Sequence, residues 1–120
     1  MNPHHARAMR AIRLLCPAVS DREMAGHVLP AFMQLDAFQK WEDAAGGRMT
    51  ITEAMQWMRE RYSIAYAPDT RESVRFSVVN PLVAAGVLVP NPDDPSRKPT
   101  SPKYCYAIPE ETLELIRLIQ

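Results

Sequence analysis

Cysteine, glycine and net charge are all scarce in this chain. Its 120 residues include two cysteines, Cys16 and Cys105, which lie far apart and have no metal-ligand spacing around them. This pattern favours reduced thiols in the cytoplasm over a disulfide scaffold. The 14 basic residues are balanced by 14 acidic ones, so no overall field draws the chain onto nucleic acid. Any such affinity must come from local groups of basic side chains.

Long apolar segments are absent as well. The longest, residues 78–89, is interrupted by Asn80 and Pro81 and falls short of the roughly 20 residues that span a bilayer. His4, His5 and several arginines stand where an export signal needs apolar residues. The sequence therefore predicts neither a membrane protein nor an exported one. The length and a 47% apolar composition are typical of one globular domain.

Helical patterns fill the first part of the chain. A helix is predicted over residues 4–16, with an apolar side opposite a row of three arginines, Arg7, Arg10 and Arg13. Ser20 and Glu23 have the spacing of a capping box and predict a second helix up to Leu35, kinked or divided at Pro30. A short helix is expected around Trp41. Residues 1–48 thus form a predicted N-terminal helical support region.

The order of elements in residues 49–120 is that of a winged helix-turn-helix. Thr50 and Glu53 form a second capping box, which opens a helix ending near Tyr62. The next helix is predicted over residues 70–85, capped by Asp69 or Thr70, stopped at Gly86, and bent or restarted at Asn80. Strands are expected at 87–89 and 103–108, with a proline-rich loop between them. A final helix after Pro109 should direct Leu113, Ile116 and Leu118 or Ile119 to the core.

The expected fold class is therefore mainly α with a small β-hairpin, one compact domain overall. On a helical wheel the valines of residues 74–83 fill one half of the second helix of the motif. The other half carries the residues predicted to enter the major groove, namely Thr70, Ser73, Phe76, Ser77 and Asn80. Asn80 suits adenine, the serines suit bases or phosphates, and Phe76 suits the methyl group of thymine or methylated cytosine. The alternative is that Phe76 packs on the first helices and Asn80 only caps.

Basic residues flank this predicted face. Residues 71–103 hold five basic and three acidic side chains. Arg71 and Arg75 are expected at the edge of the helix as phosphate contacts, although an ion pair between Arg71 and a glutamate is an open alternative. Arg97, Lys98 and Lys103 lie in or beside the loop and predict phosphate or minor-groove contacts, with simple solvation as the alternative.

Several segments carry a resemblance to a known family. They are residues 66–75 (YAPDTRESVR), the helix end at 84–86 (AAG), and the loop patterns at 91–95 (NPDDP) and 100–102 (TSP). They resemble the N-terminal domain of BsuBI/PstI-type restriction endonucleases, and weaker similarity extends towards the N-terminus. The resemblance implies a winged helix that binds double-stranded DNA ahead of a magnesium-dependent nuclease domain, which cuts a palindromic hexamer. It is also compatible with a homodimer of the full-length enzyme.

Catalysis by this chain alone is not expected. The acidic pairs 93–94 and 110–111 lack the carboxylate and lysine spacing of such nucleases, so magnesium is expected only in an associated nuclease domain and no metal site is assigned to His4 and His5. The ending at Gln120 suggests a domain cut from a longer chain. Two alternatives to a DNA-targeting domain stay open: a sensor of a methylated base, and a protein-interaction or dimerisation module.

Overall fold

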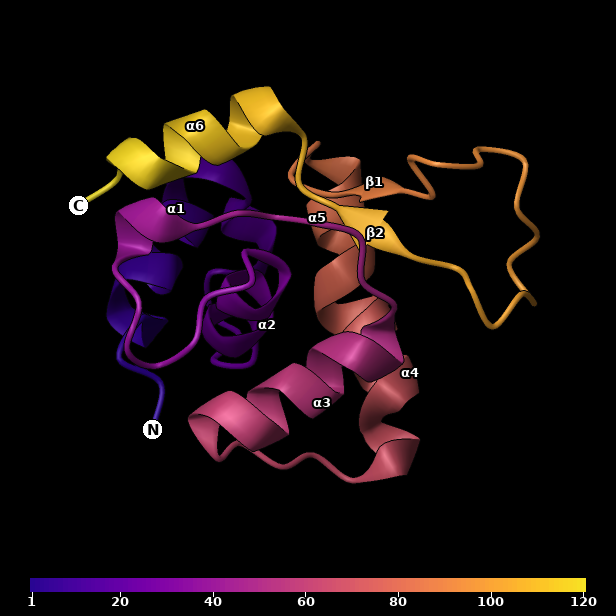
Figure 1. The fold of residues 1–120 in the computed structure, drawn as a ribbon, viewed down its shortest axis with the longest axis horizontal. Helices are drawn as coiled ribbons and strands as arrows, with labels where there is room; N and C mark the ends of the chain where they lie inside the picture. Colours follow the sequence, from indigo (N-terminus) through magenta and orange to yellow (C-terminus); the bar gives the residue numbers. More distant parts are fainter.

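The computed structural model describes all 120 residues and extends over 36 × 31 × 25 Å. Helices surround one core, and a long loop between two short strands projects away from them (Figure 1). This confirms the expected fold class. The elements are α1 (His5–Leu15), α2 (Ala25–Phe32), α3 (Ile51–Tyr62), α4 (Arg71–Val74), α5 (Asn80–Ala84), β1 (Val89–Pro90), β2 (Tyr106–Ala107) and α6 (Glu110–Leu118).

One hydrophobic cluster of 30 buried residues joins the two halves of the chain. Trp41 lies inside it and donates its indole N–H to the carbonyl of Ile116 on α6, at 2.7 Å. Trp57 on α3 donates to the carbonyl of Leu35, at 2.9 Å. Both tryptophans are therefore packing residues that tie α3 and α6 to the N-terminal segments. Burying such large rings supplies much of the hydrophobic stabilisation of a small core.

The region before α2 differs from the prediction. The chain forms a 3₁₀ turn at Pro17–Val19, and the Ser20 hydroxyl donates backwards to the Pro17 carbonyl at 2.8 Å. A hydroxyl used in this way does not cap the following helix, so the predicted capping box is wrong and α2 begins only at Ala25. Around Trp41 the predicted short helix is a 3₁₀ turn, Trp41–Asp43.

Pro30 lies inside α2 without dividing it. Proline has no N–H, so the carbonyl of Gly26, four residues earlier, loses its helical partner. The side-chain amide of Asn2 donates to that carbonyl at 3.0 Å and replaces the missing bond. The N-terminal segment thus stabilises a helix that proline would otherwise weaken.

The capping box of α3 is confirmed. The Thr50 hydroxyl accepts from the Glu53 N–H at 3.1 Å, and the Glu53 carboxylate accepts from the Thr50 N–H at 2.9 Å. The apolar side of α3 faces the core, as predicted, through Ile51, Ala54, Met55, Met58 and Tyr62. The two free N–H groups at the start of α3 are therefore satisfied locally.

The predicted recognition helix is continuous from Arg71 to Ala84, with a π-helical turn at Arg75–Val79 between α4 and α5. Neither a break nor a restart occurs at Asn80. Instead, the Asn80 N–H reaches back five residues to the Arg75 carbonyl. The wider turn makes room for the ring of Pro81, which would otherwise crowd the preceding turn.

The ends of this helix differ in how they are stabilised. At its start a 3₁₀ turn, Pro68–Thr70, replaces the expected side-chain cap, and neither Asp69 nor Thr70 makes a capping hydrogen bond. At its end Gly86 takes the left-handed conformation, with φ of 79°, as predicted. A glycine adopts this conformation without the steric cost of a Cβ atom.

The hairpin is antiparallel but shorter than predicted, with Val89 opposite Ala107 and Pro90 opposite Tyr106. Pro90 cannot donate to a ladder, which limits its length. Tyr106 also pairs with Met49 through two backbone bonds of 2.9 and 3.0 Å, so the segment before α3 continues the pairing. Val87 and Leu88 are buried core residues outside the strands. In α6, Leu118 is 76% exposed, and Ile119 packs on the core instead.

Candidate nucleic-acid interface

The helix from Arg71 to Ala84 buries one side and exposes the other. Val74, Val78, Val79 and Leu82 are buried, as the wheel predicted. Ser73 and Asn80 are exposed, Thr70 and Ser77 are half-buried, and the ring of Phe76 is 63% exposed. The alternative in which Phe76 packs on the first helices is therefore wrong, and so is the one in which Asn80 caps, since Asn80 lies inside a continuous helix.

The exposed side borders two separate hollows. Ser73 and Ser77 face one that is closed on its far side by the loop before α2, Asp21–Met24. Asn80 faces a second hollow of about 270 Å³, which lies between this helix and the hairpin. The polar residues predicted for one groove-facing surface thus divide around the π turn, with Asn80 on the side of the loop.

Glu72 organises the second hollow. Its carboxylate accepts from two nitrogens of Arg75, at 2.6 and 3.2 Å, and lies 3.9 Å from the guanidinium of Arg71. This hydrogen bonding raises the pKa of Arg75 above its usual value. The guanidinium of Arg75 also lies 5.0 Å from the centre of the Phe76 ring, within cation–π range. Of the two arginines predicted to contact phosphate, Arg71 is exposed and Arg75 half-buried, and both are already paired with the same carboxylate.

Tyr104 and Tyr106 close the hollow from the hairpin side. Their rings lie 5.5 Å apart in an edge-to-face arrangement, and Tyr106 packs in the same way on Phe32 of the core. Burial raises the pKa of Tyr106, with the neighbouring Tyr104 adding to the shift. The sequence prediction missed Tyr104. Its place beside the second strand of the hairpin was the available signal.

The loop between the strands is held by an internal network centred on Asp93. Arg97 donates to both oxygens of Asp93, at 3.0 and 2.7 Å, and also to the Asn91 side chain and the Lys103 carbonyl. Arg48 approaches the same carboxylate from the segment before α3. The hydrogen bond from Arg97 holds the pKa of Asp93 far below its usual range. The network anchors the loop to the body of the domain.

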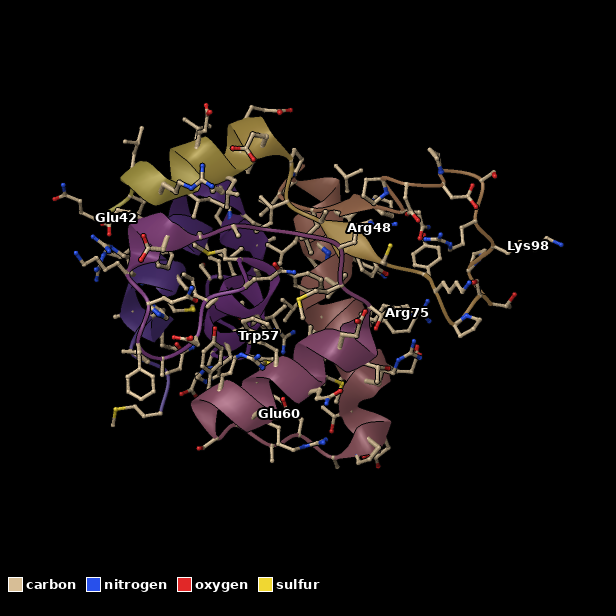
Figure 2. All side chains as sticks on the ribbon, viewed as in Figure 1. Glu42, Arg48, Trp57, Glu60, Arg75 and Lys98 are labelled. Carbon is tan, nitrogen blue, oxygen red and sulfur yellow. The ribbon has the colours of Figure 1, made fainter.

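The three basic residues predicted for the loop consequently differ. The Arg97 side chain is 13% exposed and its guanidinium is bound within the loop, in contrast to the free basic side chain that the sequence suggested. Lys98 and Lys103 are exposed and form no ion pair. Lys98 points into solvent at the outer end of the loop (Figure 2). Arg48 was not predicted as part of this region, because its contact with Asp93 joins segments that are distant in the chain.

The arginine row on α1 is mostly engaged elsewhere. Arg7 pairs with Glu42 at 3.5 Å and lies over the ring of Trp41, and Arg10 donates to the carbonyl of Gln120 at 2.9 Å. These contacts connect α1 to the segments packed against it. They favour the interpretation of this row as a structural surface over one that follows a DNA backbone.

A cluster of His5, Glu23 and His27 was not foreseen. Their ligand atoms lie within 4.8 Å of one another. The ring nitrogens already serve packing, since His27 Nδ1 accepts from the Asn2 amide and His5 Nε2 contacts the Glu23 carbonyl, each at 3.0 Å. A Cβ on Gly26 would meet the His5 ring at 2.6 Å, so the ring fills a space that glycine leaves. The cluster therefore acts as a joint between α1 and α2.

The domain is a winged helix-turn-helix, because α3 and the helix at 71–84 are followed by an antiparallel hairpin with a projecting loop. Residues 11–120 match the BsuBI/PstI restriction endonuclease HTH domain, and the chain belongs to this family. The resemblance identified from the sequence is thereby confirmed. No helix of this chain has both the length and the apolar character needed to cross a membrane.

Two type II restriction enzymes are similar in sequence. The chain is 34% identical over 117 residues to BsuBI of Bacillus subtilis, and the matched region covers 94% of this chain and 37% of that enzyme. It is 39% identical over 92 residues to AplI of Arthrospira platensis, covering 77% and 28% respectively. The structure of SdaI restriction endonuclease has the same fold, with a TM-score of 0.79, 22% identity, and coverage of 98% of this chain and 39% of that one. The chain thus spans less than two fifths of each of these proteins.

Proposed function

We propose that this domain binds double-stranded DNA and directs a restriction endonuclease to its recognition site. One observation supports the proposal most directly. Part of the exposed side of the recognition helix borders the same hollow as the projecting loop, with Arg71, Arg75 and Asn80 lining it from the helix and Pro99 and Tyr104 from the hairpin side. A duplex that received the helix in its major groove would therefore meet the loop on its adjacent backbone.

The proposed contacts follow from exposure and chemistry. Asn80 suits adenine through its two amide groups, and Phe76 presents an exposed apolar ring to a methyl group in the groove. Thr70, Ser73 and Ser77 serve as hydroxyl contacts to bases or phosphates. Arg71, Arg75, Lys98 and Lys103 contact phosphates. Arg97 acts through the shape of the loop, since its guanidinium is held by Asp93.

Titration of the chain against labelled duplexes over a range of salt concentrations tests the proposal. Phosphate contacts release counterions, so affinity should fall steeply between about 50 and 200 mM salt. Fluorescence anisotropy measures the affinity directly. Absence of binding at low ionic strength, or binding that is insensitive to salt, would contradict the proposal.

We also propose that cleavage belongs to a separate, magnesium-dependent nuclease domain, fused or associated with this one. The carboxylates here suit arginine better than a divalent cation. Asp93 is shared by Arg48 and Arg97, and Glu110 pairs with Arg117 at 3.2 Å. A nuclease centre needs clustered carboxylates that are free to hold the ion. The residues of this chain therefore do not fit such a centre.

A second candidate function is the sensing of a methylated base, and the exposure of Phe76 favours it. The methyl group of 5-methylcytosine occupies the same position in the major groove as that of thymine, where an aromatic side chain contacts it. Paired duplexes, with and without the methyl group at the recognition site, separate the two functions. Equal affinity for the pair would exclude the sensor.

A protein-interaction role is the third candidate, favoured by three exposed leucines, Leu14 on α1 and Leu115 and Leu118 on α6. Leu115 and Leu118 are three residues apart and so lie on one side of α6, and exposed apolar side chains grouped in this way commonly mark contact surfaces. Sedimentation of the chain with and without duplex decides between this role and DNA binding. A tight dimer whose sedimentation the duplex leaves unchanged would favour interaction.

A further inference from the structure

Glu72 is the single acidic residue that lines the hollow between the recognition helix and the hairpin. Its carboxylate lies 2.6 Å from Arg75 and 3.9 Å from Arg71, so it occupies the anion position between the two guanidinium groups. We propose that this carboxylate holds the place of a DNA backbone phosphate, and that duplex binding exchanges phosphate for carboxylate on Arg71 and Arg75. The inference rests on the proposed DNA-binding function and names the phosphate subsite within it.

The chemistry of the two acceptors supports the exchange. Carboxylate and phosphate both present paired oxygens that accept from the fork of a guanidinium group, and phosphate carries an additional oxygen for other donors. The hollow supplies such a donor in the Tyr104 hydroxyl. A phosphate at this place would therefore have more partners than the carboxylate has.

The ion pairs of Glu72 are exposed enough to be exchanged. Its side chain is 55% accessible, and those of Arg71 and Arg75 are 46% and 36% accessible. Ion pairs at such exposure are weak because water and salt screen them. The carboxylate thus keeps both arginines oriented in the free protein and yields to a stronger anion.

The exchange has a consequence for affinity. Every duplex must displace Glu72 to reach the two arginines, whatever its sequence, because phosphates are common to all sequences. Glu72 therefore weakens binding to all DNA alike. This limits capture of the domain by the large excess of sites that it does not recognise.

Glu72→Gln tests the proposal in the 120-residue chain. The substitution keeps a side chain of the same size but removes its charge. We expect binding to random-sequence duplexes to tighten roughly 3-fold to 10-fold at low salt, with the dependence of log affinity on log salt nearly unchanged, because the same two arginines contact phosphate in both proteins. Combined with Arg71→Gln and Arg75→Gln, the substitution should produce no gain.

Glu60→Gln is the matched control. Glu60 is an exposed carboxylate on α3 that pairs with neighbouring Arg61 at 3.5 Å and lies outside this hollow (Figure 2). Glu60→Gln changes the net charge by the same amount as Glu72→Gln. Because it leaves Arg71 and Arg75 untouched, it should alter affinity much less. Circular dichroism and thermal unfolding check that each variant is folded.

The outcomes separate the two proposals. If the unaltered chain fails to bind duplex DNA at low salt, both the proposed function and this inference are overturned. If it binds with the expected salt dependence, but Glu72→Gln leaves affinity unchanged or weakens it, the inference alone is overturned, and Glu72 is then a brace that orients Arg75. Equal tightening by Glu60→Gln would also overturn it, because net charge would be the cause.

Discussion

Arg97 and Asp93 bind one another through two hydrogen bonds, 2.7 and 3.0 Å long, across one turn of the loop between β1 and β2. Arg48 joins the same carboxylate from the segment that leads into α3. The position of the loop beside the recognition helix is thereby set by residues 45 positions apart in the chain. A basic residue that the sequence offered as a DNA contact serves as an anchor.

Asp93→Asn should loosen this loop. The variant removes the charge that holds Arg48 and Arg97, so trypsin should cleave the Arg97–Lys98 bond faster than in the unaltered protein. Because the ion pairs lie near the surface, the temperature of global unfolding should change little. Asp94→Asn is the control, since the Asp94 side chain accepts a hydrogen bond only from the nearby Ser96 hydroxyl. Identical cleavage rates for both variants would contradict the anchoring role.

Lys98→Ala and Lys103→Ala should each weaken binding to duplexes of every sequence by a similar factor. Both side chains are exposed and form no ion pair, so they are free for phosphate. Each loss should reduce the slope of log affinity against log salt by about 0.9. Lys40→Ala, in the exposed segment before Trp41, removes the same charge away from the loop and should leave the slope nearly unchanged. A loss confined to certain sequences would argue against backbone contacts.

Asn80→Ala and Phe76→Ala should alter the preference among sequences, since both side chains are exposed on the recognition helix. The loss of a good base contact costs about 1–3 kcal/mol for the preferred base. Selection of bound duplexes from a randomised pool, followed by sequencing, measures the change for each variant. A uniform loss over the pool would assign these residues to backbone contacts instead.

Asn2→Ala should destabilise the fold by about 1–3 kcal/mol, because it leaves the buried Gly26 carbonyl without a hydrogen-bond donor. Urea unfolding gives the free energy. Asn80→Ala makes the same change at an exposed position and should be nearly neutral. If the two variants were equally stable, the hydrogen bond from Asn2 to the Gly26 carbonyl would not contribute to the stability of the fold.

Stability should fall as the pH drops below about 6.5, the pKa of an unperturbed histidine. Burial lowers the pKa of His27, and the nearby His5 lowers it further. The unfolded chain then binds a proton more readily than the folded one, so the contribution is complete above the unfolded pKa and is lost as the pH falls through the folded value. Urea unfolding at pH 7.5 and 5.5 measures it, and His27→Asn, which keeps an acceptor for Asn2, should flatten the profile.

Local signals in the sequence predicted local structure well. Thr50 and Glu53 satisfy each other's backbone within one turn, and Gly86 needs only its own backbone freedom, so both were readable from a few residues. The capping box predicted at Ser20 and Glu23 has the same spacing but does not form. The Ser20 hydroxyl donates to the Pro17 carbonyl of a competing turn instead.

Contacts between distant segments were beyond the reach of the sequence pattern. The pairing of Arg48 with Asp93, and of Asn2 with Gly26, depends on the packed fold. The candidate site shows the same division. Exposure of Ser73, Phe76 and Asn80 followed from helical periodicity, whereas the pairing of Arg71 and Arg75 with one carboxylate, and the anchoring of Arg97, required the structure.

The π turn at Arg75–Val79 amounts to one residue more than an α-helix would use over the same rise. The wider turn takes up this residue, so the segments on either side keep nearly the relative orientation that they would have in an uninterrupted α-helix. If the same residues were wound as an ordinary α-helix, everything after them would be rotated by about 100° relative to Arg71. Leu82 would then leave the core, and the hairpin would start in a direction where Tyr106 no longer meets Met49. The widened turn therefore keeps the buried side of the helix continuous and sets the orientation of the wing.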